Sequence, residues 1–290
     1  MLVELIRENA ESFEPLPTGL TPQVEPLENI HAVVFDVYGT LIASGVGDIS
    51  LAEDQRRDAA IEEAIEGVGF RFNPTVNDLS ERFRAMIRAR QEERKAEGIA
   101  YPEVEIREVW ERLIEDLCEQ ELLDGELTRK RLEALSVRFE MAVNPVWPMP
   151  GAPEAIASIT RRALPLGIVS NAQFFTPLLF EAFFEKDLEA LGFDPVCCVW
   201  SYLKREAKPS RALYREAAEK FRGRYRIEPE QILYVGNDIR NDIWPAREEG
   251  FRTALFAGDR RSLRLREDDP DCAHVKPDRV VTELSQIQEK

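Results

Sequence analysis

Residues 32–41 read AVVFDVYGTL, and this stretch gives the clearest structural signal in the chain. Its first four residues are apolar on both faces and rich in β-branched and aromatic side chains, as expected of a strand in the centre of a sheet. The run ends at Asp36, and Gly39 follows as a turn residue. The stretch therefore predicts a buried strand with a carboxylate at its carboxyl end.

From about residue 150 onward, short apolar runs alternate with segments of helical periodicity. The runs predict strands at 166–169, 196–200, 232–235 and 253–256. The segments beside them predict helices at 152–162, 174–191, 209–223 and 240–249. Such alternation is typical of parallel βαβ units. We therefore expect an α/β fold, a doubly wound, Rossmann-like parallel sheet that includes the strand at 32–35.

The rest of the chain indicates an insertion and an arm. Residues 46–143 have 3.6-residue periodicity and almost no β-rich runs, which predicts an all-helical domain. Residues 1–29 hold a short helical signal and four prolines, which predicts an arm laid over a domain. We therefore predict an arm at 1–29, an α/β core at 30–45 and 144–290, and a helical insertion at 46–143.

Composition narrows the class of protein. The 290 residues contain 38 Lys and Arg against 54 Asp and Glu, a net charge of -16 that disfavours nucleic acid and membrane partners. The four cysteines have no CxxC spacing, so we expect neither a zinc site nor a disulfide framework. No apolar run of membrane-spanning length occurs, and no signal peptide is evident. These features predict a cytoplasmic globular protein.

Four motifs place polar side chains at or just after predicted strand ends, where α/β proteins assemble their ligand sites. The motifs are FDVYGTL, IVSNA, Lys-Pro and YVGNDIRND. Their chemistry-bearing side chains are carboxylates, neutral hydrogen-bonding groups and one cation: Asp36, Thr40, Ser170, Asn171, Lys208, Asn237, Asp238, Asn241 and Asp242. The turn amides and the Thr40 hydroxyl suit an anion. Lys208 is a point charge suited to bridging a carboxylate and an anionic substrate.

In this order, the motifs resemble those of the haloacid dehalogenase-like superfamily of hydrolases, over residues 30–45 and 149–260. The resemblance implies that Asp36 is a nucleophile, which forms a covalent aspartyl intermediate that water then hydrolyses. It also implies that residues 46–143 are a helical cap that closes over the site and excludes water.

The resemblance implies roles for the other motif residues as well. Thr40 and Ser170 would bind the transferred or leaving group, with Asn171 as a neighbouring hydrogen-bond donor. Lys208 would neutralise charge. Asp238 and Asp242 would hold a metal or position water.

Two reactions remain open within this family. Its phosphatases usually carry a second Asp two residues after the nucleophile, to protonate the leaving group, and this chain has Tyr38 there. Dehalogenating members typically have Tyr at that position and another six residues after the motif Lys, which Tyr214 matches. The fourth motif is richer in acids than the dehalogenase version, yet Asn237 stands where phosphatases usually have a metal-binding Asp.

Electrostatics favours the phosphatase interpretation at this stage. If Asp36, Asp238 and Asp242 converge with Lys208, two negative charges remain, and two carboxylates about 4 Å apart repel by roughly 4 kcal/mol at an effective dielectric near 20. A Mg²⁺ ion would relieve this, with Asp36, Asp238 and the Tyr38 carbonyl as ligands; whether Asn237 or Asp238 faces the metal stays open. We therefore expect Mg²⁺-assisted hydrolysis of a phosphoester. The alternatives are a metal-independent haloacid dehalogenase and a non-catalytic binding protein on the same scaffold.

Substrate choice would depend on cap side chains. Tyr101, Glu103 and Glu105 precede a predicted cap helix and are candidates for this role, although ordinary helix-start chemistry explains Glu103 equally well. We expect a small, anionic substrate. The sequence specifies neither its identity nor the oligomeric state.

Overall fold

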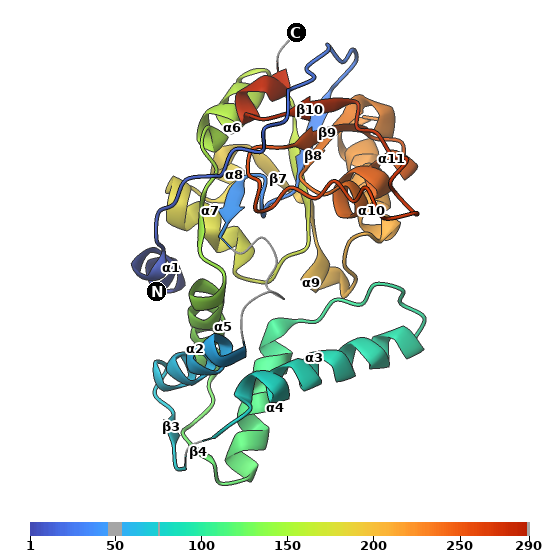
Figure 1. The fold of residues 1–290 in the computed structure, drawn as a ribbon. Helices are drawn as coiled ribbons and strands as arrows, with labels where there is room; N and C mark the ends of the chain where they lie inside the picture. Colours follow the sequence, from blue (N-terminus) through green and yellow to red (C-terminus); the bar gives the residue numbers. More distant parts are fainter. Residues whose placement is uncertain (46–53, 75, 289–290) are drawn as a thin grey trace.

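The computed structural model describes residues 1–45, 54–74 and 76–288. At its centre lies a parallel sheet of six strands (Figure 1). They are β1 (Ala32–Phe35), β6 (Leu166–Ser170), β7 (Phe193–Trp200), β8 (Ile232–Gly236), β9 (Arg252–Phe256) and β10 (Arg279–Val281). The strand order is β10-β9-β8-β1-β6-β7, so the first strand in the chain lies between β6 and β8. This confirms the predicted α/β fold class.

Helices cover both faces of the sheet. They are α6 (Ala152–Arg161), α7 (Thr176–Phe184), α8 (Leu188–Leu191), α9 (Ser201–Lys204), α10 (Arg211–Tyr225) and α11 (Trp244–Glu248). The predicted helix at 174–191 is divided because Glu185 adopts a left-handed conformation and Asp187 caps a new helix. The predicted helix at 240–249 starts with a π turn, η3 (Ile239–Ile243). Two short 3₁₀ turns, η2 (Pro229–Gln231) and η4 (Leu284–Gln288), flank the later strands.

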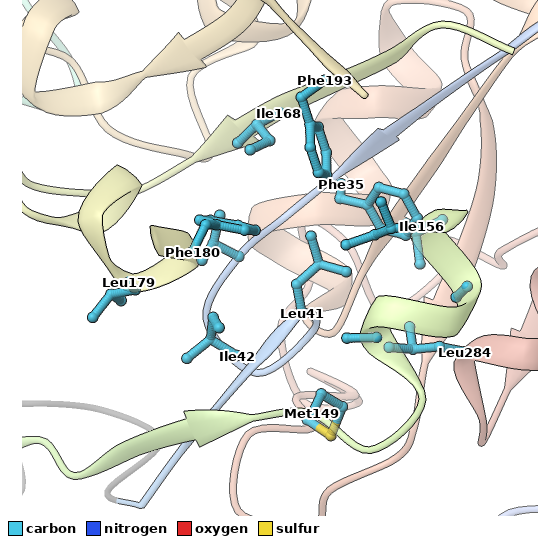
Figure 2. Packing of buried hydrophobic residues seen from close by; sticks show 14 of the residues in the cluster. Phe35, Leu41, Ile42, Met149, Ile156, Ile168, Leu179, Phe180, Phe193 and Leu284 are labelled. Carbon is cyan, nitrogen blue, oxygen red and sulfur yellow. The ribbon is translucent and has the colours of Figure 1, made fainter. Parts of the chain in front are cut away.

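Two apolar layers hold the sheet. On one face, Phe35 and Ile168 pack with residues of α6 and α7 (Figure 2). On the other face, Val34 and Tyr234 pack with residues of α10 and α11. Burial of these side chains fixes β1 in the middle of the sheet, so its carboxyl end is surrounded by neighbouring strands.

The insertion forms a separate group of helices below the sheet in Figure 1: α2 (Asp54–Glu66), α3 (Leu79–Ala96), α4 (Ile106–Glu119) and α5 (Arg129–Val143). It has its own apolar cluster around Phe83, Trp110 and Phe139, whose ring centroids lie 4.3 to 5.3 Å apart. One short antiparallel pair, β3 (Arg71–Phe72) with β4 (Leu123–Asp124), adds to the helices we predicted. Residues 46–53, where we expect the insertion to begin, lie outside the described residues.

An antiparallel ribbon joins the insertion to the sheet domain. Its strands are β2 (Ile42–Ser44) and β5 (Val146–Pro148). The hydroxyl of Ser44 donates to the Asn144 side chain at 2.6 Å, so the two connecting chains are also linked by side chains. The ribbon brings the end of α5 next to the loop that follows β1.

The N-terminal residues run along the outside of both parts. Helix α1 (Leu2–Asn9) packs against α5 and α7, and Arg7 donates to the carbonyl of Ala182. Further on, Gln23 pairs with Val280 of β10. The four cysteines are free thiols. Among the described helices, none is long and apolar enough to cross a membrane.

Candidate active site

The sheet order brings the polar motifs to one place. Strands β6 and β8 flank β1, so Asp36, Ser170 and Asn237 lie at neighbouring strand ends. A pocket of about 380 Å³ opens at this edge. Its lining includes residues of the predicted motifs, namely Asp36, Tyr38, Asn171, Lys208, Asn237, Asp238, Asn241 and Asp242.

Lys208 lies between two carboxylates. Its Nζ donates to Asp36 Oδ1 at 2.7 Å and to Asp242 Oδ1 at 2.6 Å, and all three side chains are less than 10% exposed. Burial alone would lower the pKa of Lys208, but the two carboxylates raise it above its ordinary value. Lys208 is therefore a permanent cation at neutral pH.

Asp242 is fully engaged by donors. Its Oδ1 accepts from Lys208 and from the Tyr234 hydroxyl, while its Oδ2 accepts from the backbone N–H groups of Asn237 and Asp238. Burial raises its pKa to about 6, against the opposing effect of Lys208. Gly236 permits this packing, because a Cβ there would lie 2.5 Å from the Asp242 Cγ. Asp242 therefore fixes Lys208 and the loop after β8.

Asp36 keeps one oxygen available. Lys208 holds Oδ1, and no residue in the described ranges donates a hydrogen bond to Oδ2. The following turn is fixed at Gly39, where φ is +79° and a Cβ would lie 2.6 Å from the Ser262 side chain. The carboxylate is thus aimed by one charged hydrogen bond and retains a free oxygen toward the pocket.

Thr40 and Ser170 do not line the pocket, in contrast to our expectation. Both are fully buried. Thr40 donates to Asn237 Oδ1 at 3.1 Å, and Ser170 donates to the carbonyl of Asn171. Asn171 does line the pocket, and its Oδ1 accepts from the backbone N–H of Lys208 at 2.7 Å. The two hydroxyls therefore support the site from behind.

Asp238 has an ion-pair partner that the sequence did not reveal. Arg266 donates from Nε to Oδ1 at 3.1 Å and from Nη2 to Oδ2 at 2.6 Å. The same carboxylate accepts from the backbone of Arg240 and from Asn241. Its neighbour Asn237 donates its amide to the Ser262 carbonyl. Both positions that we considered as metal-facing are thus occupied by protein donors or partners.

These contacts do not fit the magnesium site that we predicted from Asp36, Asp238 and the Tyr38 carbonyl. Both oxygens of Asp238 face a guanidinium group, and a cation beside them would be repelled by Arg266. Within the described residues, no group of three His, Cys, Asp or Glu side chains is placed to hold a metal ion. Three carboxylates, Lys208 and Arg266 leave one net negative charge where we had expected two.

Tyr38 also lines the pocket. Its hydroxyl is within 3.0 Å of the Thr176 hydroxyl. Burial and the nearby Glu140 carboxylate raise its pKa above the ordinary value, so Tyr38 is a weak acid here. Tyr214 lies behind Asp242 and donates to the Asn241 carbonyl at 2.6 Å, which leaves it outside the pocket lining.

Several residues that line the pocket were not predicted from the sequence. Arg264 and Arg266 come from the loop after β9, Gln173 follows β6, and Glu140 and Asn144 come from the end of α5. Of the three candidates for specificity, Glu103 lines the pocket, whereas Tyr101 and Glu105 do not. Glu105 instead caps α4, because its side chain accepts a hydrogen bond from the backbone N–H of Arg107.

Comparison with known proteins agrees with this geometry. The family model of the haloacid dehalogenase-like hydrolases matches residues 30–250, and the chain belongs to this family. It is therefore a hydrolase. No curated protein matches the sequence significantly.

Solved structures of similar fold include dehalogenases and a predicted phosphatase. A 2-haloacid dehalogenase from Pseudomonas syringae pv. Tomato DC3000 is 18% identical with a TM-score of 0.54, over 89% of this chain and 96% of that one. An L-2-haloacid dehalogenase from Xanthobacter autotrophicus is 21% identical with a TM-score of 0.48, over 89% and 96%. A predicted phosphoglycolate phosphatase from Haemophilus somnus 129pt is 17% identical with a TM-score of 0.47, over 90% and 98%. At these identities the similarity concerns the fold alone.

Proposed function

We propose that this hydrolase cleaves the carbon–halogen bond of a small 2-haloacid through an ester on Asp36, without a metal ion. The observation that carries the proposal is the pairing of Asp238 with Arg266. The guanidinium group of Arg266 supplies the positive charge for which we had invoked Mg²⁺. Asp36 is left with Lys208 as its partner and one free oxygen.

The first chemical step suits these groups. Asp36 Oδ2 donates an electron pair to the carbon, a C–O bond forms, and the C–halogen bond breaks with its electrons leaving on the halide. A halide is the conjugate base of a strong acid and needs no proton on departure. Tyr38, which stands at the position of the usual leaving-group acid, is a weak acid, but this reaction needs no acid there and is not slowed.

The pocket also offers a partner for the substrate carboxylate. Arg264 lines it, and within the described part of the chain its guanidinium group donates hydrogen bonds only from Nη1, to the carbonyls of Arg261 and Leu263. Those bonds fix the guanidinium group, and its remaining N–H groups match a carboxylate. We propose that Arg264 orients the acid group while Asp36 attacks the adjacent carbon.

We further propose that residues 46–143 act as the cap over this site, with 1–29 as the arm and the remainder as the core. Gln173 supports this, because its side chain accepts from Ile106 N and donates to Val104 O, joining the two parts beside the pocket. Such contacts would exclude water during the first step.

Mg²⁺-assisted phosphoester hydrolysis is the second candidate. One observation favours it: two guanidinium groups, from Arg264 and Arg266, reach the pocket, and arginine is well suited to a phosphoryl group. A phosphatase of this kind would act slowly, since Tyr38 replaces the leaving-group acid, and would prefer substrates with good leaving groups.

A turnover panel separates the two reactions. Purified enzyme is incubated with 2-chloro- and 2-bromo-acids and with an activated aryl phosphate, each with Mg²⁺ or with EDTA. Halide release that EDTA does not change supports the proposal. Phosphate release that requires Mg²⁺, without halide release, contradicts it and favours the second candidate.

A further inference from the structure

We infer that Glu140 is a catalytic base of this enzyme, which activates the water that hydrolyses the covalent intermediate on Asp36. The inference rests on the proposed covalent mechanism and goes beyond it, because neither the motifs nor the reaction class assigns a role to this side chain. Glu140 lies in the last turn of α5 and lines the same pocket as Asp36 and Tyr38.

The hydrogen bonds of Glu140 leave it ready to bind a water. Its Oε1 accepts from Asn144 Nδ2 at 2.9 Å, and Asn144 is held in turn by Ser44. No donor to Oε2 occurs in the part of the chain that the structure describes. One oxygen is therefore anchored to the connecting ribbon, while the other keeps its lone pairs for a molecule in the pocket.

The other pocket carboxylates are less suited to this task. The four donors on Asp242 fill its acceptor positions, as described above, so a water proton has no lone pair to approach. Asp238 is held by Arg266, and Asp36 carries the ester. Glu103 accepts from Val104 N at Oε1 and from Ser201 Oγ at Oε2. Glu140 is the remaining carboxylate of the described pocket lining.

The electrostatic surroundings agree with this role. Burial raises the pKa of Glu140 to about 7, although the hydrogen bond from Asn144 opposes the shift. A base works best when its pKa lies near the working pH, because it is then both ionised and basic enough to accept a proton. The negative charges of Glu140 and Asp36 add to burial in raising the pKa of Tyr38, so Tyr38 stays protonated.

The second half-reaction then balances. The water oxygen attacks Cγ of the Asp36 ester while Glu140 takes one water proton. The tetrahedral intermediate collapses by breaking the bond between Cγ and the substrate-bound oxygen, and Glu140 returns its proton to that oxygen to give the hydroxy acid. Asp36 loses the other water proton to solvent and is again a carboxylate, now carrying one oxygen from water.

The test compares Glu140→Gln with wild type in rapid-quench experiments. We expect one equivalent of halide to be released at a near-normal rate, followed by breakdown of the ester about 100-fold slower or more, with the adduct on Asp36 seen by mass spectrometry. In wild type, breakdown should accelerate as the pH rises through about 7, and this dependence should be absent from the variant. Glu62→Gln, at an exposed position of α2, is the control and should accumulate no adduct.

The outcomes separate this inference from the proposed reaction. Breakdown at the wild-type rate in Glu140→Gln, with no adduct, overturns the role of Glu140 even if halide is released. If wild type releases phosphate from the aryl phosphate instead of halide, the same experiment follows the aspartyl phosphate, and its accumulation in Glu140→Gln supports the base. A wild-type enzyme that forms no adduct on Asp36 with any of these substrates overturns both.

Discussion

Arg266 and Asp238 form a two-point ion pair at the edge of the pocket, with donor–acceptor distances of 3.1 and 2.6 Å. The arginine side chain is 37% exposed and the carboxylate 9%, so the cation covers the carboxylate from the solvent side. A divalent ion would have to displace a guanidinium group here. The pair therefore supports the metal-independent reaction proposed above over the magnesium-assisted one.

Arg266→Met should convert this corner into a better cation site. Loss of the guanidinium group changes the local net charge from -1 to -2. We therefore expect the variant to bind Mg²⁺ at least tenfold more tightly than wild type does, as measured by isothermal titration calorimetry. Arg260→Met is the matched control, because Arg260 is an exposed arginine of the same loop. Equal Mg²⁺ affinity of wild type and Arg266→Met would contradict the charge argument.

Asp36→Asn should abolish turnover and leave the fold intact. The amide cannot donate an electron pair to carbon as a carboxylate does, so we expect a loss of at least ~1000-fold in kcat. Thermal unfolding checks the fold. In a single turnover of wild type in H₂¹⁸O, the label should enter Asp36, and label in the product alone would rule out the ester.

The fold was predictable because its signals are local. The central strands are apolar on both faces, so β1, β6 and β8 stand out in the sequence. Strand β10 was missed because it has only three residues and begins with an arginine. The break at Glu185 was missed for a similar reason, since a left-handed residue other than glycine leaves no composition signal.

The residues of the candidate site were also predictable only where their signals are local. Asp36, Lys208 and Asp242 follow strands or precede helices of the core, and the sheet brings such positions together whatever the loops do. Glu140, Arg264 and Arg266 reach the pocket from a helix end of the insertion and from a long loop. Their approach depends on tertiary packing, which has no periodicity in sequence. Missing Arg266 led directly to the expectation of a metal ion.

Lys208→Met should destabilise the protein strongly. Two buried carboxylates, of Asp36 and Asp242, would lose their shared cation, and breaking a buried ion pair costs about 3–5 kcal/mol. Urea denaturation at pH 8 measures this. The penalty should shrink as the pH falls, because protonation of Asp242 removes one charge. Adding Asp242→Asn should restore part of the stability but none of the activity, and a strictly additive double variant would contradict the shared-cation model.

Glu140→Gln should stabilise the protein at alkaline pH, the opposite of its expected effect on turnover. The folded-state pKa of Glu140 is about 7 and its ordinary value is 4.5. Between these values the folded protein retains a proton that the unfolded chain has released, so wild-type stability falls as the pH rises through this window. The amide removes that dependence, and we expect the variant to be more stable than wild type by about 1–3 kcal/mol at pH 8.

The difference in stability should nearly vanish at pH 4.5, as measured by urea unfolding. Glu62→Gln, at an exposed position, serves as the control. A difference that stays constant between these pH values would show that Glu140 is not held in its protonated form by burial.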